Sequence, residues 1–401
     1  MKRSIVPIIA SLFVAACQSD RLVTPNESSL SSGAALEASA VATGSYALPA
    51  PAAHGLRVMT YNLYLGTNLW GIMAAQTPAQ ALAAAALAYA ELQQTNFPAR
   101  AGKIADQIAK VRPDVIGLQE VAEWSVSAPY TPPGAPGAPF VVRYDFLQLV
   151  LDSLGARGLN YAAASAEWTT DVAAPVPTAF SGGYPTAFAL VRFHDRDAIL
   201  VRSGLQYSDP RQGVYAAFVP LPQLGAGIGL YRGWCSVLVT RDGRTFRFVN
   251  THPEAESDQI NFLQVQELAG LLANVTDPVV WVGDFNSDAN TQAPSYSLAI
   301  AAGFTDLWAQ AHPRDPGLTN GPNDGVGALN AEGVLVPYPS IALDKRIDLI
   351  LVRDPFGAPS AVHAAIFGNQ PTDRTAAGLW PSDHLTVGIV FEMPTQLAGG
   401  Q

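Results

Sequence analysis

Residues 279–288, Val-Val-Trp-Val-Gly-Asp-Phe-Asn-Ser-Asp, bring a carboxylate and a carboxamide together directly after a short apolar run. Residues 279–282 have the branched apolar composition of a buried strand, and Gly283 would let the chain turn after it. Asp284 and Asn286 are two residues apart, so both side chains point to the same side of an extended chain. Taken alone, this segment is more typical of an Asx turn that closes a strand.

Five further segments begin or end an apolar run with side chains of similar chemistry. They supply Asn62 after residues 56–59, Glu120 at the end of residues 114–120, His252 after residues 244–249, Asp348 within residues 346–352, and Asp383 and His384 at the start of the last strand pattern. Singly, each has a structural alternative, such as a turn cap or an exposed strand end. Together they offer the oxygen ligands and proton-transfer groups that bind a hard cation and activate water.

The order and local context of these motifs resemble the endonuclease/exonuclease/phosphatase superfamily, which includes pancreatic-type deoxyribonucleases, neutral sphingomyelinases and inositol-polyphosphate 5-phosphatases. The matching motifs are Met-Thr-Tyr-Asn-Leu, Ile-Gly-Leu-Gln-Glu-Val, Asn-Thr-His, Gly-Asp-Phe-Asn, Arg-Ile-Asp-Leu-Ile and Ser-Asp-His, between about residues 57 and 391. One such motif is weak, whereas the ordered set is specific. The resemblance implies an α/β fold, a four-layer sandwich of two mixed β-sheets flanked by helices, with the site at one edge of the sandwich.

The resemblance also implies a metal-dependent phosphoester hydrolase. Glu120 would be the main metal carboxylate, with Asn62 and Asp383 nearby. Mg²⁺ usually takes only one or two protein carboxylates and keeps several waters, so it is the expected cofactor, and Mn²⁺ is an alternative.

The remaining motif residues would carry the chemistry. By the same resemblance, Asp284, held beside Asn286, would orient and deprotonate the attacking water or bind a second metal. His252 and His384 would donate hydrogen bonds to the phosphoryl oxygens. Asp348 would fix the tautomer of His384 and raise its pKa, because a nearby carboxylate favours the charged imidazole.

One stretch departs from the family pattern. Many members carry Asn-Gly-x-Ala-Ile-Leu-Ser-Arg, and the nearest match, residues 196–202, lacks the glycine and the serine. The carboxylate that orients His252 is therefore unidentified, with Asp197 as the candidate. The histidines outside any motif are expected on the surface or in the linker; they are His54, His194, His312 and His363.

The N-terminus predicts export. Lys2 and Arg3 precede a short apolar stretch, residues 5–14, which is too short to span a bilayer and is typical of a signal peptide. Small residues before Cys17 resemble a bacterial lipoprotein signal, so residues 1–17 are expected to be its signal peptide, with Cys17 lipidated. An ordinary signal peptide is the alternative. The mature protein would be a membrane-anchored lipoprotein facing the periplasm or the cell exterior.

The rest of the chain is expected to hold a linker and one domain. Residues 18–55 are rich in Ser, Ala, Pro and Gly and predict a flexible tether, and residues 56–395 predict the catalytic domain. Loop insertions are expected at residues 67–98, with a helix over 79–94, and at residues 125–140, 171–185 and 317–339. Apolar spacing predicts helices over residues 100–111 and 258–274. Cys235 is expected to fill a core strand, without a disulfide.

The net charge of −10 argues against a broad basic surface for nucleic acid. The expected substrate is therefore an extracytoplasmic lipid or a small organic phosphoester. The N-terminal lipid anchor would hold the enzyme beside the membrane. The alternatives are an extracellular nuclease, with nucleic acid as substrate only, and, more remotely, a non-catalytic binding module. No obligate protein partner is evident.

Overall fold

A computed structural model describes residues 48–49, 55–131, 134, 137–181, 184–221, 227–323 and 325–394. The predicted signal peptide, Cys17 and most of the predicted linker lie outside the described residues. Leu48 packs against the hydrophobic core, and the Pro49 carbonyl accepts a hydrogen bond from Arg57. No helix within the described ranges is both long and apolar enough to cross a bilayer.

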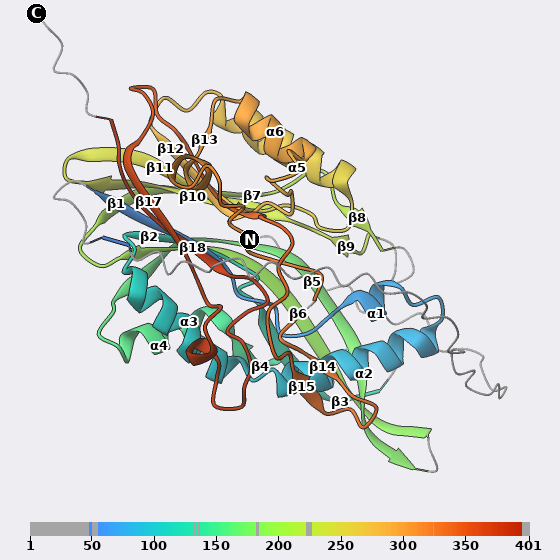
Figure 1. The fold of residues 1–401 in the computed structure, drawn as a ribbon. Coiled ribbons are helices and arrows are strands. Elements are labelled where there is room, and N and C mark those ends of the chain that lie inside the picture. The colour runs from blue at the N-terminus through green and yellow to red at the C-terminus, as the bar shows by residue number, and fades with distance from the viewer. Residues whose placement is uncertain are drawn as a thin grey trace, which may run out of the picture.

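Two β-sheets face each other, and helices cover their outer faces (Figure 1). The first sheet has the order β17 (Ser360–Phe367), β18 (Thr386–Glu392), β1 (Leu56–Asn62), β2 (Val115–Gln119), β6 (Tyr184–Arg202), β3 (Glu123–Tyr130), β4 (Val141–Asp145). A further strand of this sheet, β5 (Tyr161–Ser181), pairs with β6. The second has the order β13 (Thr305–Asp306), β16 (Asp348–Arg353), β12 (Val279–Asp284), β11 (Arg244–His252), β10 (Gly233–Arg241), β7 (Gln206–Val214). Two small hairpins pair β8 (Val219–Pro220) with β9 (Gly229–Leu230), and β14 (Gly327–Leu329) with β15 (Leu335–Pro337).

The helices form the two outer layers. The first sheet carries α2 (Pro78–Gln94), α3 (Phe97–Val111) and α4 (Phe146–Gly155), and the second carries α5 (Asp258–Leu272) and α6 (Pro294–Ala301). Three short helices complete the described part of the chain: α1 (Trp70–Met73), α7 (Leu307–Ala311) and the 3-10 turn η2 (Pro371–Asp373). The predicted four-layer α/β sandwich is confirmed.

Strand alternation explains the layers. In β12, Val280 and Val282 pack between the two sheets, whereas Val279 and Trp281 pack against the α5 side. Because successive side chains of a strand point to opposite faces, a strand that is apolar throughout requires cover on both faces. Gly283 continues β12 instead of turning the chain as predicted: a Cβ there would lie 2.0 Å from the Thr251 carbonyl oxygen of the neighbouring strand.

Two pairs of parallel strands bring the motifs to one edge. β1 runs parallel to β2 in the first sheet, and β11 runs parallel to β12 in the second. Their carboxyl ends carry Asn62, Glu120, His252 and Asp284. β16 is antiparallel to β12 and starts at Asp348, directly opposite Asp284. Side chains that are far apart in sequence therefore meet at a single edge of the sandwich.

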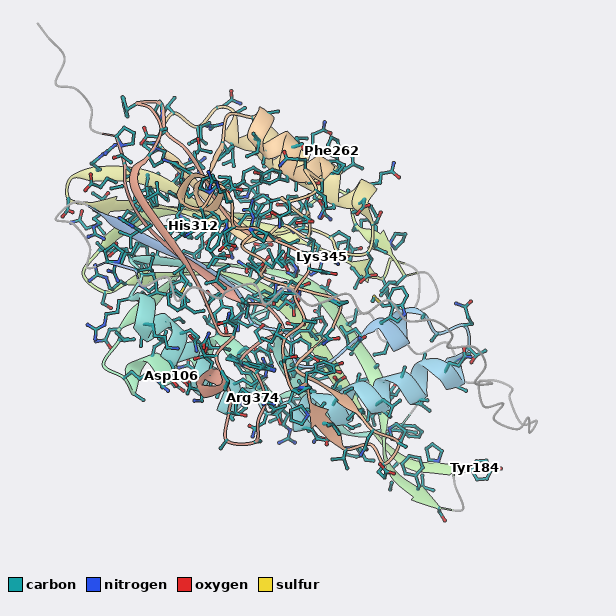
Figure 2. All side chains as sticks on the ribbon, in the orientation of Figure 1. Asp106, Tyr184, Phe262, His312, Lys345 and Arg374 are labelled. Atoms are coloured by element: carbon teal, nitrogen blue, oxygen red, sulfur yellow. The ribbon has the colours of Figure 1, made fainter. Side chains whose placement is uncertain are left out.

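Three of the four predicted loop insertions contain strands. Residues 125–130 belong to β3, residues 171–181 and 184–185 belong to the long hairpin of β5 and β6, and residues 317–339 include β14 and β15. Pro175 and Pro177 lie within β5, which pairs with β6, and proline is tolerated on an edge strand because one side needs no backbone donor. The hairpin end marked by Tyr184 projects beyond the layers (Figure 2).

The other sequence predictions need only small changes. Helix α3 begins at Phe97, three residues before its predicted start, and α5 ends at Leu272, two residues before its predicted end. Cys235 is buried in β10, as predicted. Of the isolated histidines, His363 is exposed and His54 lies outside the described residues. His194 and His312 are only half-exposed, since His194 stacks on Trp168 and His312 bonds to the Ala364 carbonyl.

Candidate active site

A cleft of about 700 Å³ lies at the edge where the motif residues meet. Its lining includes Glu120, His252, Asp284, Asn286, Asp383 and His384. Asn62 and Asp348 are buried directly behind these side chains, where they contact Asp284 and His384. All eight residues selected from the sequence therefore belong to one site.

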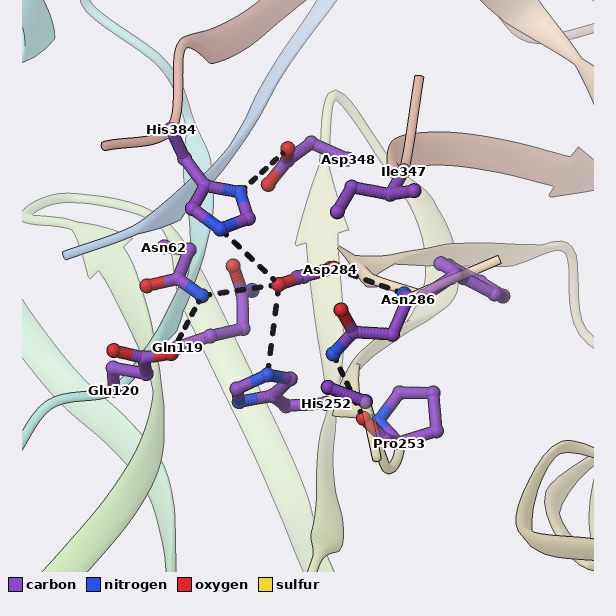
Figure 3. A network of polar contacts seen from close by, with 12 residues as sticks. Asn62, Gln119, Glu120, His252, Pro253, Asp284, Asn286, Ile347, Asp348 and His384 are labelled. Carbon is purple, nitrogen blue, oxygen red and sulfur yellow. Dashed lines mark hydrogen bonds and ion pairs between the residues drawn. The ribbon is translucent and has the colours of Figure 1, made fainter. Parts of the chain in front are cut away.

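Asp284 lies at the centre of the contacts (Figure 3). Its Oδ2 atom accepts a hydrogen bond of 3.0 Å from Asn62 Nδ2 and lies 3.5 Å from His252 Nε2 and 3.6 Å from His384 Nε2. Its Oδ1 atom accepts the backbone N–H of Asn286 at 2.9 Å. These contacts orient the carboxylate toward both imidazoles.

The two histidines have opposite charge preferences. Asp348 Oδ2 lies 2.9 Å from His384 Nδ1. Burial alone would lower the pKa of His384, but Asp348 and Asp284 raise it well above the usual value. Burial lowers the pKa of His252, and Arg232 and His384 lower it further. His384 is thus the imidazolium and His252 the neutral imidazole of this site.

Unusual backbone conformations place two of the side chains. Glu120 has a φ of 55° directly after β2, and Asn286 has a φ of 47° two residues after β12. Non-glycine residues adopt this left-handed region at a cost of about 1–3 kcal/mol, and such residues cluster at functional sites. The turn at Asn286 also lets its side-chain amide donate to the Pro253 carbonyl at 3.1 Å.

The acids beside this centre fit a divalent cation. Burial, together with the charges of Asp383 and Asp195, raises the pKa of Glu120 to about 7. Asp195 is also buried, and its Oδ1 atom has no hydrogen-bond partner among the described residues. A cluster of hard, negatively charged oxygens is stabilised by a hard cation. Glu120 and Asp383 are the residues that would hold it.

Asn62 connects two of the carboxylates of the site. Its Oδ1 atom accepts the backbone N–H of Tyr64 at 2.9 Å, while Nδ2 donates to both Glu120 Oε1 and Asp284 Oδ2 at 3.0 Å. The amide therefore helps to hold Glu120 and Asp284 in place. The expected role of Asn62 as a metal ligand stays a prediction.

A second set of candidate ligand atoms has a different explanation. Asp284, Asp348 and His384 offer atoms within 4.8 Å of one another. His384 Nδ1 bonds to Asp348 Oδ2 at 2.9 Å, and its Nε2 atom lies 3.6 Å from Asp284 Oδ2, as expected of an imidazolium placed between two acids. We therefore assign this trio to proton transfer and hydrogen bonding.

The sequence did not reveal the cation next to His252. Arg232 precedes β10, lines the cleft and places Nη1 3.3 Å from His252 Nδ1. Its guanidinium also lies 3.5 Å from Glu254 and 4.0 Å from Asp195. A single arginine beside a glycine carries no motif, so only the structure identifies it.

Asp197 does not take the role proposed from the sequence. It is buried, and burial followed by the charge of Asp195 raises its pKa well above the usual value. The charged side chains that contact His252 in the described structure are Arg232 and Asp284. Asp284 is therefore the carboxylate beside His252.

Several solved structures are similar to this chain at low sequence identity. A humanized TDP2 of D. rerio is 15% identical with a TM-score of 0.47, and the match covers 84% of this chain and 99% of the other. A mannosyl-6-phosphatase of Bacteroides thetaiotaomicron is 17% identical with a TM-score of 0.43, covering 84% and 100%. No curated protein matches the sequence.

The family comparison covers the whole site. The sequence model of the Endonuclease/Exonuclease/phosphatase family matches residues 59–384. This range runs from β1 to the Ser-Asp-His motif and includes every residue assembled above. The chain therefore belongs to the endonuclease/exonuclease/phosphatase family, whose members are typically metal-dependent phosphoester hydrolases.

Proposed function

We propose that this protein is a Mg²⁺-dependent phosphodiesterase in which water attacks phosphorus. The observation that carries the proposal is the position of Asp284, whose Oδ2 atom lies between the Nε2 atoms of His252 and His384. A carboxylate beside one neutral and one charged imidazole combines a base for water with donors for phosphoryl oxygens.

Asp284 is the proposed general base. Burial raises its pKa, and the charge of Asp348 raises it further, whereas His384 opposes the shift. A more basic carboxylate accepts the proton of water more readily as the new P–O bond forms. The backbone N–H of Asn286 and the amide of Asn62 hold its two oxygens in place.

His384 and His252 are the proposed donors to the phosphoryl group. The imidazolium of His384 is aligned by Asp348 and stabilises negative charge as it develops on the phosphoryl oxygens. His252 donates as a neutral imidazole, and Arg232 adds a positive charge on the same side of the cleft. A divalent cation bound at Glu120 and Asp383 would neutralise negative charge on the non-bridging oxygens and on the leaving alkoxide.

The charge of the cleft supports a small or lipid-like diester as substrate. Its described lining carries three cationic side chains, Arg232, Lys345 and the imidazolium of His384, and seven acids. The acids are Glu120, Asp195, Glu256, Asp258, Asp284, Asp288 and Asp383. A long polyanion would be repelled here, because nucleic-acid affinity rests mainly on contacts between cations and phosphates.

We further propose that this activity is extracytoplasmic, with Cys17 carrying the lipid anchor. The support is the sequence alone: a basic start, a short apolar stretch, and small residues before the cysteine. Cys17→Ser should move the protein from the membrane fraction to the soluble fraction. Unchanged fractionation would contradict lipid anchoring without affecting the hydrolase proposal.

A substrate panel tests the reaction. Bis(4-nitrophenyl) phosphate, 4-nitrophenyl phosphate, plasmid DNA and sphingomyelin vesicles are assayed with Mg²⁺, with Mn²⁺ and with chelator. Diester or lipid cleavage that chelator abolishes is expected, and Asp284→Ala or His384→Ala should lower it by about 100-fold or more. His363→Ala is the matched control, since His363 is an exposed histidine on β17. Preferential cleavage of plasmid DNA would instead favour the nuclease.

A further inference from the structure

Part of the lining of the cleft is apolar. It includes Leu69, Trp70, Met73, Phe193 and Leu230, which we call the apolar wall. The lining also carries the charged side chains of Glu256, Asp258, Asp288 and Lys345. The proposed reaction at phosphorus uses neither set of residues.

Trp70 is the most exposed aromatic side chain of this wall. It is 56% exposed, and the four-residue helix α1 that carries it has no buried residue. Tryptophan offers a large apolar face, and an exposed one at a concave site gains stability when a ligand covers it. The hydrophobic core does not require Trp70 in this position.

The apolar wall is held in place from two sides. Ile72 and Met73 of α1 pack with Val219, Leu221, Ile228 and Leu230 in and around the β8–β9 hairpin. On the other side, buried Glu91 of α2 accepts hydrogen bonds from Thr67 Oγ1 at 2.9 Å and from the Asn68 backbone N–H at 3.1 Å. Asn68 Oδ1 in turn accepts the Trp70 backbone N–H at 2.7 Å.

The same segment connects the wall to Glu120, the proposed metal carboxylate. Tyr64 donates to Glu91 Oε1 at 3.3 Å, and the next residue, Leu65, donates its backbone N–H to Glu120 Oε2 at 2.6 Å. Glu91 does not line the cleft, so it acts through residues 64–70. A side chain with these contacts positions the wall relative to the reacting phosphate.

We infer that the apolar wall binds the organic group esterified to the phosphate, that this group is a hydrocarbon or aromatic group, and that Glu91 is a positioning residue for the wall. The inference rests on the proposed function and specifies its substrate class. A charged or sugar-like substituent would instead contact the charged residues of the lining.

Binding of n-alkylphosphonates tests the wall without turnover, because this reaction does not hydrolyse a P–C bond. Dissociation constants for methyl-, butyl- and octylphosphonate are measured by calorimetry with Mg²⁺ present. Burial of one methylene contributes about 0.8 kcal/mol, or roughly fourfold in affinity, so butylphosphonate should bind at least about tenfold more tightly than methylphosphonate. Equal affinity for all three ligands overturns the inference.

Trp70→Ala should remove most of this chain-length dependence and leave methylphosphonate binding within about threefold of wild type. Tyr184→Ala is the matched control, because Tyr184 is 71% exposed and lies at the far end of the β5–β6 hairpin (Figure 2). It should behave as wild type. Retention of the full chain-length dependence by Trp70→Ala overturns the role of the wall.

The role of Glu91 is tested by the ratio of butyl- to methylphosphonate affinity, because a loss of stability alone would not identify a positioning residue. Glu91→Ala leaves the donors of Thr67 and Asn68 without their acceptor and should reduce the ratio of butyl- to methylphosphonate affinity about as much as Trp70→Ala does. Glu91→Gln keeps an acceptor and should restore most of the ratio. An unchanged ratio in folded Glu91→Ala contradicts the positioning role.

Hydrolysis of bis(4-nitrophenyl) phosphate by the same samples separates the two proposals. If the protein hydrolyses the diester but binds all three phosphonates with equal affinity, the role of the apolar wall is refuted and the proposed function is not. If affinity increases with chain length but no hydrolysis is detected, the proposed function is refuted and the role of the wall is not. Cleavage of phospholipid vesicles, compared with cleavage of a soluble hexyl 4-nitrophenyl phosphate, distinguishes a membrane lipid from a soluble ester as the source of the apolar group.

Discussion

At the scale of single residues, His252 and His384 show how environment separates two side chains of the same type. Both imidazoles are buried beside Asp284. His384 also has Asp348 at 2.9 Å, whereas His252 has Arg232 at 3.3 Å. A neighbouring carboxylate favours the charged form and a neighbouring guanidinium the neutral form, so the two pKa values move in opposite directions.

Asp348→Asn should lower the pKa of His384, because it removes a charge that raises that pKa. Because the pKa of His384 is raised in the folded protein, its imidazolium is present at pH values below that pKa. The imidazolium is lost as the pH increases through the pKa. The alkaline limb of the profile of kcat against pH should therefore move to lower pH, with a loss of about 10- to 100-fold at pH 8. An unshifted limb would mean that His384 does not act as the imidazolium.

Glu120 provides a second pH dependence. Burial, followed by the charges of Asp383 and Asp195, raises its pKa to about 7 in the absence of a cation. The carboxylate must ionise to bind a metal, so calorimetric Mn²⁺ affinity should be weak at pH 6 and should increase through about pH 7. Glu120→Gln should abolish binding, while Glu256→Gln, in the same cleft, should retain it. Metal affinity that is independent of pH in this range would reject Glu120 as the main ligand.

At the scale of elements, helix α3 organises the strand ends that carry the site. Its Arg100 is fully buried, and Nη1 donates to the carbonyl oxygens of Leu63 at 2.8 Å and Pro381 at 2.9 Å. Leu63 follows Asn62, and Pro381 precedes the Ser-Asp-His motif. One guanidinium thus links two motifs that are more than 300 positions apart in the chain.

Arg100→Met should lower the free energy of unfolding by about 3 kcal/mol, because buried carbonyl oxygens lose their donors. Chemical denaturation measures this loss. Lys103→Met is the control on the same helix, since Lys103 is partly exposed and donates to the Thr372 carbonyl. It should change stability by less than about 1 kcal/mol. Equal effects of the two substitutions would show that the buried network does not stabilise the fold.

At the scale of the whole molecule, a polar contact joins the two sheets close to the site. Asn250 of β11 donates to the Leu118 carbonyl at 2.9 Å and the Ala198 carbonyl at 3.2 Å, and accepts from Gln119 Nε2 at 2.6 Å. All three partners belong to the first sheet. Close contact is possible because Gly117 has no side chain: a Cβ there would lie 2.6 Å from Asn250 Oδ1.

Asn250→Ala should therefore destabilise the whole domain by about 2–4 kcal/mol, since it leaves buried groups unsatisfied on both sheets. The two sheets share one core, so unfolding should remain a single transition by near-UV and far-UV circular dichroism. Asn290→Ala, an exposed asparagine that donates to the Pro316 carbonyl, should have little effect. Two separate transitions in the wild type would contradict a single cooperative unit.

Much of the fold was predictable where a local pattern is strong. The apolar strand of β12 and the helices α2, α3 and α5 lie within a few residues of their predicted positions. The long β5–β6 hairpin was missed, since residues 171–185 were expected to be a loop insertion. Strand pairing with β6 supplies the backbone hydrogen bonds there, and pairing between distant segments is invisible in a local window.

The amino-acid sequence by itself determined the family motifs, whose resemblance implied the four-layer sandwich, and the eight polar residues of the site. Only the tertiary structure decided that Asn62 presents its nitrogen, that Arg232 lies beside His252, and that Glu91 holds the apolar wall. Periodicity and motif spacing are properties of neighbouring residues. The direction of an amide, the charge of an imidazole and the partner of a buried acid depend on side chains that only folding brings within hydrogen-bonding distance.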